Sequence, residues 1–198
     1  MKLFHSAASP FVRKVMACAI TRGIDGRIDL VPTNPHVSPP ELIAMNPLSK
    51  VPCLVTDDGL ALFDSRVICE FLDSIGDALP MFPAAGGPRW KALKQQAIGD
   101  GIMDAAVGRR MEGAKPGEAA RDVFMARMKA AVDRALSELE GELPHRAVDI
   151  GSISVACALG YLDFRFPHED WRAAHPELAA WFEGFSEHSG IAQTMPVG

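Results

Sequence analysis

The stretch that decides the fold of this 198-residue chain is Lys50–Ser65, KVPCLVTDDGLALFDS. Its apolar runs Val51–Thr56 and Leu60–Phe63 flank an Asp-Asp-Gly step, and Asp-Gly between apolar runs is a strong hairpin signal. The two residues that close the stretch carry oxygens suited to capping a helix. Apolar residues then repeat at helical spacing: Val67, Ile68, Phe71, Leu72 and Ile75. The stretch predicts two antiparallel strands followed by a helix.

Toward the N-terminus, the pattern predicts strand, helix, strand and short helix. Lys2–His5 is a short apolar-containing run, and Ser9-Pro10 has the chemistry of an N-cap followed by a first-turn proline. The helix that follows can end at Gly23, and Ile28–Val31 reads as a second strand. Ser38–Glu41 matches a capping box for the short helix. The resulting order, β-α-β-α-β-β-α, predicts a small mixed sheet of the thioredoxin-like type.

Toward the C-terminus, the composition predicts a linker and then helices only. Pro80–Pro88 carries three prolines and two adjacent glycines, which interrupt regular structure. We therefore expect a thioredoxin-like domain over 1–79, a linker over 80–88 and a helical domain over 89–198. Helical spacing recurs within that last region at Phe124–Leu139, Ile153–Gly160 and Pro176–Phe185.

Composition and charge exclude several classes of protein. The chain has 20 basic and 25 acidic side chains, a formal net charge of -5, and 48% hydrophobic residues, which is ordinary globular composition. Neither half is basic, so we expect neither nucleic acid nor an anionic membrane as a partner. No stretch approaches the roughly 18 apolar residues of a membrane span, and residues 1–6 turn polar early. We expect a cytoplasmic protein.

The sequence contains no motif for metal binding, nucleotide binding or a disulfide framework. The four cysteines show no close pairing, so we expect reduced thiols, and Cys53 reads as a small buried strand residue. The histidines lack metal-binding spacing, so no metal is expected. Gly99-Asp100-Gly101 follows no strand and is interpreted as local helix flexibility rather than a phosphate loop. Arg109-Arg110 is interpreted as a solvated face.

Three local patterns suggest a ligand, and each has a plainer structural explanation. Ser9 lies where a strand hands over to a helix, so its hydroxyl and the helix end would stabilise an anion; alternatively it only caps the helix. Pro52 could be a cis bend that leaves the Val51 main chain available to a ligand peptide, or an ordinary trans proline. Asp64-Ser65 could hold the α-amino acid end of a ligand, or merely cap its helix.

Taken in order, Ser9–Val15, Asn46–Pro52 and Phe63–Ser65 resemble the cytosolic glutathione S-transferase family. The likeness continues through Pro176–Trp181 and Thr194–Pro196, so it covers essentially the whole chain. The Ser-Pro-Phe opening is similar to serine-type members, including plant tau-class and short bacterial forms. The resemblance implies a thioredoxin-like domain that binds glutathione, a helical domain that completes a hydrophobic pocket for a second substrate, and a homodimer.

The resemblance also implies residue roles at the glutathione site. Ser9 is expected to hydrogen-bond the glutathione sulfur, and Val51, before an expected cis Pro52, to pair with the cysteinyl backbone. Lys50 should approach the tripeptide's polar backbone or glycyl end. Asp64 and Ser65 match the pair that holds the γ-glutamyl amino and carboxylate groups.

Further positions follow from the same resemblance. His36 is a candidate contact for the glycyl carboxylate, while Phe11, Met103 and Val107 are expected to line the pocket for a small hydrophobic electrophile. Many members carry a capping aspartate three residues after the Ser152 position, where this chain has Val155. That helix is therefore expected to rely on other contacts.

The expected activity is glutathione transfer, because a serine favours activation of the glutathione thiolate, whereas the cysteine of other members favours thiol exchange. Two alternatives stay open. One is a non-catalytic protein of the same fold that binds a partner through Arg109-Arg110 or the aromatic face of the Pro176–Phe185 helix. The other is a glutathione-dependent isomerase, ether lyase or dehalogenase, which shares the glutathione site and differs in the apolar pocket.

Overall fold

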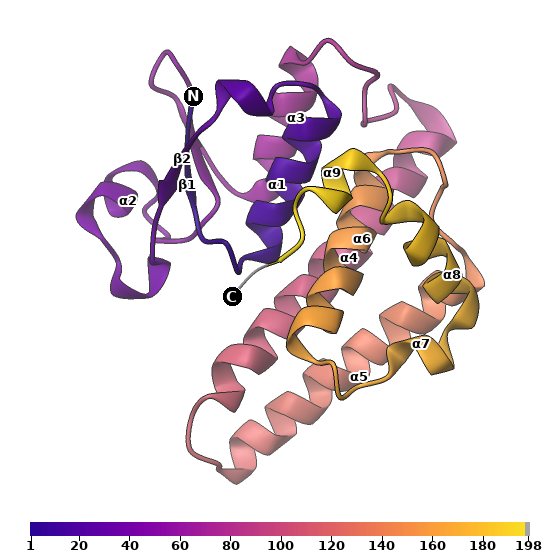
Figure 1. Ribbon diagram of the computed structural model, residues 1–198. Coiled ribbons are helices and arrows are strands. Elements are labelled where there is room, and N and C mark those ends of the chain that lie inside the picture. The colour runs from indigo at the N-terminus through magenta and orange to yellow at the C-terminus, as the bar shows by residue number, and fades with distance from the viewer. Residues whose placement is uncertain (197–198) are drawn as a thin grey trace. The chain divides into compact units, whose positions relative to one another are not determined.

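The computed structural model describes residues 1–196, and the chain divides into two compact units (Figure 1). The first comprises residues 1–84 together with the C-terminal segment that starts at His188, and the second comprises residues 85–187. The expected first domain ends at residue 79 and the expected helical domain starts at residue 89, so both bounds differ from this division. The expected domains remain a prediction about which segments fold on their own.

The first unit is a four-stranded mixed sheet covered by helices, which confirms the thioredoxin-like class. Strand β1 pairs in parallel with β2 and antiparallel with β3, which pairs antiparallel with β4, so the order is β2-β1-β3-β4. Helices α1 and α3 lie together on one face of the sheet, and α2 lies on the other (Figure 1). The elements are β1 (Lys2–His5), α1 (Pro10–Thr21), η1 (Asp25–Arg27), β2 (Asp29–Pro32), η2 (Pro35–Val37), α2 (Pro40–Met45), β3 (Cys53–Val55), β4 (Ala61–Leu62), α3 (Ser65–Ile75) and α9 (Ser189–Ala192).

Local signals account for most of these boundaries. Ser9 is the N-cap of α1 with Pro10 in its first turn, and Gly23, at φ +69°, follows the helix end in the left-handed conformation that glycine tolerates best. Gly59 takes φ +90° in the turn between β3 and β4, as the hairpin signal predicts. The core between sheet and helices contains fully buried side chains such as Leu54 and Ile68, each worth roughly 1.5–3 kcal/mol on burial.

The expected capping box at Ser38–Glu41 is wrong. Ser38 ends η2 in a left-handed conformation, φ 48°, and its hydroxyl lies 3.1 Å from the hydroxyl of Ser49. Helix α2 instead follows Pro39, which has no side-chain cap to offer, and starts at Pro40. A proline at the first helical position needs no hydrogen-bond partner for its nitrogen, so this helix starts without the box.

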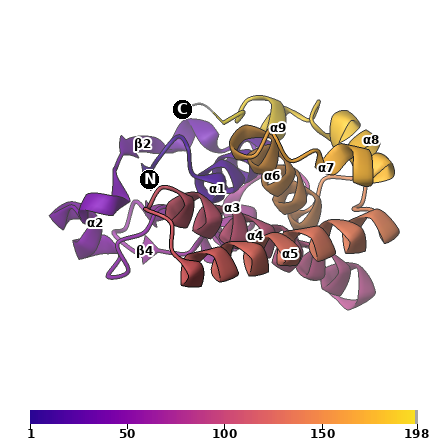
Figure 2. The same cartoon turned by 90° about the horizontal axis from the view of Figure 1, so that it is seen from below.

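The second unit is helical throughout its described length, as expected. Its helices are α4 (Gly86–Gly113), α5 (Ala119–Gly141), α6 (Ile150–Arg165), α7 (Trp171–Ala174) and α8 (Pro176–Phe185). Helix α4 lies beside both α5 and α6 (Figure 1 and Figure 2). It begins at Gly86, inside the segment expected to be linker, and α6 is buried over nearly its whole length.

Two glycines let α4 and α6 approach closely. A Cβ on Gly99 of α4 would lie 2.7 Å from the Ser154 carbonyl carbon and oxygen, and one on Gly151 of α6 would lie 2.7 Å from the Ala92 carbonyl oxygen. Real Cβ atoms do not approach backbone so closely. The interpretation of Gly99-Asp100-Gly101 as a flexible point is therefore wrong for Gly99, which is a packing contact; Gly101 faces open space.

Helix α6 does have a capping box, but it starts three residues earlier than expected. Asp149 is the N-cap: its Oδ1 accepts from the Ser152 backbone N–H at 2.8 Å. The Asp149 backbone N–H in turn donates to Ser152 Oγ at 2.9 Å. The expectation that Val155 marks a missing cap is wrong, because Ser152 occupies the third helical position rather than the cap; Val155 is fully buried.

We predict opposite effects for alanine at the two neighbouring glycines of α4. Gly99→Ala forces the helices apart and lowers stability by about 1–3 kcal/mol, which outweighs the gain in helix propensity. Gly101→Ala gains helix propensity without a clash and raises stability by up to about 1 kcal/mol. Thermal unfolding followed by circular dichroism measures both. Equal melting temperatures for the two variants would show that the close approach is not rigid.

The cap of α6 gives a second stability prediction. Asp149→Ala removes the acceptor for the Ser152 N–H and lowers stability by about 1 kcal/mol, whereas Asp149→Asn keeps a side-chain oxygen there and costs little. The matched pair is compared by midpoint temperature in the same buffer. If both variants melt together, the hydrogen bond contributes nothing to stability.

Candidate functional site

Strand pairing brings three predicted motifs to one edge of the sheet. Phe4 pairs with Cys53, so the C-terminal end of β1 lies beside the start of β3. Because β4 runs antiparallel to β3, with Leu54 opposite Leu62, the chain leaves β4 at that same edge. Residues that follow β1, precede β3 and follow β4 are thus neighbours in the fold.

Ser9 lies at this edge as the N-cap of α1. Its Oγ accepts a hydrogen bond from the Val12 N–H at 3.3 Å, and the residue is half-buried. The plainer explanation of Ser9, a helix cap, is therefore confirmed. A hydroxyl that accepts from the backbone keeps its own proton to donate, and the positive end of the helix favours an anion as recipient.

The loop before β3 is held by Asn46, to which no role was assigned from the sequence. Asn46 is buried; its Nδ2 donates to the Lys50 carbonyl at 2.9 Å and its Oδ1 accepts from the Leu48 N–H at 3.0 Å. The Val51–Pro52 peptide bond is cis, as the resemblance implied. Within residues 1–196, the Val51 N–H and carbonyl have no hydrogen-bond partner. The Asn-Pro pair is a sequence signal for this role, because asparagine side chains often hydrogen-bond to the backbone of their own turn.

The third motif begins α3. Asp64 is the N-cap, exposed, and its Oδ1 accepts from the Arg66 N–H at 2.9 Å. Ser65 is the first helical residue and is buried. One carboxylate oxygen engaged in capping leaves the other to meet a cation, while the first-turn N–H groups suit a carboxylate. The arrangement fits a zwitterionic amino acid end.

Thiol chemistry by the protein itself is disfavoured at this edge. Burial raises the pKa of the Cys53 thiol to about 11, which keeps it protonated at neutral pH. The other cysteines, Cys18, Cys69 and Cys157, are also buried. Burial likewise lowers the pKa of His5 at the end of β1, which favours its neutral form. A hydroxyl, rather than a thiolate, is therefore the group presented near the start of α1.

The remaining predicted positions are spread over both units. Lys50 and His36 are exposed in the first unit, and Phe11 is half-buried in the first turn of α1. Met103 is buried and Val107 half-buried, both on α4 of the second unit. Their role in a substrate pocket stays a prediction.

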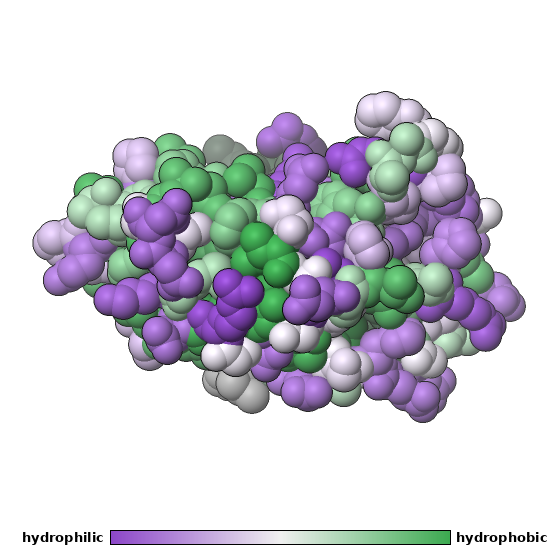
Figure 3. Space-filling view, turned by 90° about the horizontal axis from the view of Figure 1, so that it is seen from above, coloured by the Kyte–Doolittle hydropathy of each residue, from purple (hydrophilic) through white to green (hydrophobic). Residues whose placement is uncertain are grey.

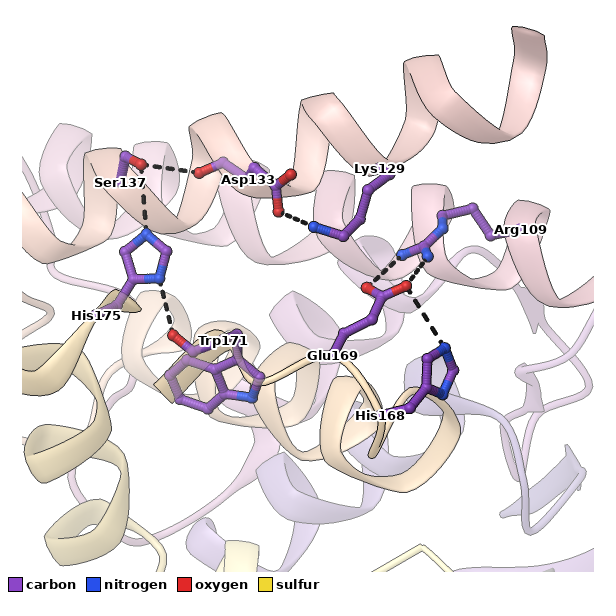
Figure 4. Close-up of polar contacts among 8 residues, drawn as sticks. All are labelled: Arg109, Lys129, Asp133, Ser137, His168, Glu169, Trp171 and His175. Carbon is purple, nitrogen blue, oxygen red and sulfur yellow. Dashed lines mark hydrogen bonds and ion pairs between the residues drawn. The ribbon is translucent and has the colours of Figure 1, made fainter. Parts of the chain in front are cut away.

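The interpretation of Arg109-Arg110 as a solvated face is wrong for Arg109. Only 5% of Arg109 is exposed, and its guanidinium donates two hydrogen bonds to Glu169 (Figure 4). The same guanidinium lies 4.2 Å from the centroid of the Phe166 ring. Arg110 is exposed. Adjacent helical residues point about 100° apart, so one turns inward and the other outward.

A cavity of about 200 Å³ lies in the second unit among α5, α6 and α7, and sequence reasoning did not indicate it. Its polar groups bind one another: Lys129 pairs with Asp133, and His175 bridges Ser137 Oγ at 3.3 Å and the Trp171 carbonyl at 2.9 Å (Figure 4). The other lining residues are Val132, Leu136, Leu162, Phe166, Glu169, Asp170 and Ala174. Because these polar side chains already bind one another, the cavity indicates no particular ligand.

Exposed apolar side chains are scattered over the described residues. On the face shown in Figure 3, apolar groups lie among hydrophilic ones, and exposed apolar side chains such as Leu79 and Trp90 occur in both units. Scattered exposure of this kind is ordinary. Over residues 1–196, no cluster of three potential metal-binding side chains is found, and none of the helices is long and apolar enough to span a bilayer.

Known proteins are similar to this chain in architecture and in sequence. Residues 8–75 match the family model "Glutathione S-transferase, N-terminal domain", and residues 122–184 match "Glutathione S-transferase, C-terminal domain". The Escherichia coli (strain K12) protein named "Uncharacterized GST-like protein YibF" is 33% identical over 201 residues, covering 99% of this chain and 98% of that protein.

Solved structures agree with the sequence matches. A glutathione transferase family member from Pseudomonas fluorescens Pf-5 with bound glutathione has a TM-score of 0.92 at 40% identity, covering 100% of this chain and 99% of that chain. A structure of a family member from the same source with bound S-(propanoic acid)-glutathione has a TM-score of 0.89 at 41% identity, covering 100% of both chains. With both halves matched, this chain belongs to the glutathione S-transferase family.

Proposed function

We propose that this protein is a glutathione transferase of the serine type, which binds glutathione at the described sheet edge and activates its thiol for attack on small hydrophobic electrophiles. The observation that carries the proposal is the Ser9 hydroxyl, which caps α1 as an acceptor and keeps its proton to donate. Glutathione bound to relatives at 40% and 32% identity supports the ligand.

The energetics of thiol activation are within reach of one hydroxyl. A free thiol of pKa about 8.5 is about 3% thiolate at pH 7, and lowering the pKa by about two units corresponds to about 2.7 kcal/mol. A hydrogen bond to a charged group contributes about 1.5–3 kcal/mol, and a helix N-terminus adds about 0.3–1 kcal/mol. Ser9 together with α1 therefore suffices.

The rest of the tripeptide has matching groups at the same edge. The unpaired N–H and carbonyl of Val51 would pair with the cysteinyl backbone in the manner of an added strand. Asp64 would accept the γ-glutamyl ammonium, while Ser65 and the first turn of α3 would bind its carboxylate. Lys50 is exposed and would approach the glycyl end, with His36 as a further candidate.

The chemistry then needs only the thiolate and a suitable carbon. The sulfur lone pair forms the C–S bond while a leaving group departs with its electron pair, or while the neighbouring carbon of an activated double bond takes a proton from water. Phe11, Met103 and Val107 are proposed as apolar contacts for the electrophile. A cytoplasmic homodimer remains our expectation for the working form.

We predict that Ser9→Ala raises the pKa of bound glutathione by about one to two units and lowers conjugation of a chloronitrobenzene at pH 7 by about ten- to a hundredfold. Ser6→Ala, in the same loop, is the matched control and keeps wild-type behaviour. Thiolate absorbance as a function of pH gives the pKa. An unchanged pKa and rate in Ser9→Ala would contradict the assigned role.

Asp64→Asn separates capping from ligand binding. Asparagine caps a helix about as well as aspartate, so the melting temperature should change little. The variant loses the negative charge that meets the ammonium, so glutathione affinity should fall about tenfold, whereas affinity for a glutathione analogue without the amino group should not change. Calorimetric titration measures both. Equal loss for the two ligands would point to a structural effect instead.

A further inference from the structure

Helices α4 and α6 pack side by side in the same chain direction, at sequence offsets between 55 (Gly99 to Ser154) and 59 (Ala92 to Gly151). Gly99 of α4 meets Ser154 and Val155 of α6, an offset of 55 or 56 positions. Ten residues on, Arg109 stacks on Phe166, just past the end of α6, at an offset of 57. By the same offset, Arg110 lies level with Arg165, which ends α6.

Arg110 is also on a particular face of α4. Met103, Val107 and Arg110 are four and three residues apart, so they share one side of the helix. On α6, Tyr161 and Arg165 are one turn apart and likewise share a side. Arg110 is therefore on the same side of α4 as the apolar residues proposed for the electrophile, while Tyr161 and Arg165 share a side of α6.

The arginines lack anionic partners. In the described chain neither Arg110 nor Arg165 forms an ion pair, and Arg165 Nε is buried with no hydrogen-bond acceptor. The carboxylates nearest in sequence are taken elsewhere: Glu112 pairs with Lys115 and Arg121, Asp163 with Arg172, and Glu169 with Arg109. Helix C-termini offset part of the two positive charges but do not supply the missing acceptor.

The surroundings hold these groups in place. Arg165 lies over the Phe164 ring, 4.0 Å from its centroid, which orients the guanidinium. Tyr161 is 5% exposed, so packing holds its phenol ring in place. Burial raises the pKa of Tyr161, and Arg165 and Arg110 both act in the opposite direction, which is consistent with two cations close to the phenol.

We infer that Arg110, Tyr161 and Arg165 form a carboxylate-binding subsite, so that the preferred electrophile is an apolar molecule ending in a carboxylate. Two guanidinium groups and a phenol O–H supply the donors that a planar carboxylate accepts. This rests on the proposed function for one step, that the Met103–Val107 face receives the electrophile. The anion-binding part stands on the second unit alone.

The decisive experiment compares two electrophiles of one shape, 4-chloro-3-nitrobenzoate and 4-chloro-3-nitrobenzamide, with each rate divided by its uncatalysed rate. Wild-type protein should prefer the benzoate by about tenfold or more in kcat/KM. Arg110→Ala and Arg165→Ala should each lower that preference by about tenfold, because the benzoate rate falls far more than the benzamide rate. Arg134→Ala, an exposed arginine of α5, controls for loss of charge alone.

A binding measurement keeps the subsite testable if no conjugation occurs. Tyr161 is the chain's one tyrosine, so protein labelled with ¹³C at the tyrosine ζ carbon gives one reporter signal at the site. The unreactive 3-nitrobenzoate should shift this signal, and 3-nitrobenzamide should not. The shift should disappear in Arg165→Ala.

The outcomes separate the two proposals. Conjugation of the benzamide without a preference for the benzoate would overturn the subsite and leave the transferase intact. A saturable Tyr161 shift without any conjugation would keep the carboxylate site and overturn the transferase. If inorganic sulfate shifts the signal at the same concentration as nitrobenzoate, the cluster binds free oxyanions, and the carboxylated electrophile is overturned.

Discussion

The antiparallel pairing of β1 with β3 is the constraint on which the site depends. Phe4 opposite Cys53 fixes where the chain leaves β1 and where it enters β3, and the β3–β4 pairing then fixes where Asp64 stands. A slip of one residue would turn every side chain of a strand to the opposite face. Leu3 and Leu54 are fully buried, so that slip would expose core side chains. Burial of the sheet therefore also sets the position of the helix starts that would hold the tripeptide.

Signals confined to a few neighbouring residues predicted local structure well. The Asp-Gly hairpin, the Ser9 cap and the Pro176–Phe185 helix are confirmed because turn and cap chemistry need no distant partner. The two capping errors differ in cause. Helix α2 starts at a proline with no side-chain cap, so Ser38 caps nothing there; at α6 the sequence offers both Asp149 and Ser152, and local pattern does not rank them. Which one caps depends on where the helix can pack.

Contacts between distant segments were out of reach of pattern reasoning. The residues around Gly99 do not predict its close contact with Ser154, and the residues around Arg109 do not predict its ion pair with Glu169. The same holds for Arg110 and Arg165, which only the α4–α6 offset relates. At the candidate site, sequence pattern indicated the positions of Ser9, Val51 and Asp64, whereas their roles came from the family resemblance. The chain belongs to the glutathione S-transferase family, whereas the serine-type assignment rests on Ser9 alone and stays a prediction.

Capping and catalysis are often treated as competing explanations for a serine at a helix start, but hydrogen-bond directions make them compatible here. The Val12 N–H donates to a lone pair of Ser9 Oγ, which leaves the hydroxyl proton available for donation. The backbone N–H holds the oxygen in place, so the hydroxyl proton can point in only a few directions. Of these, the direction toward an anion near the positive helix end has the most favourable electrostatic energy. The cap thus stabilises α1 and orients the donor in one contact. An alanine would end both contributions, whereas a threonine would preserve the oxygen and crowd the approach with a methyl group.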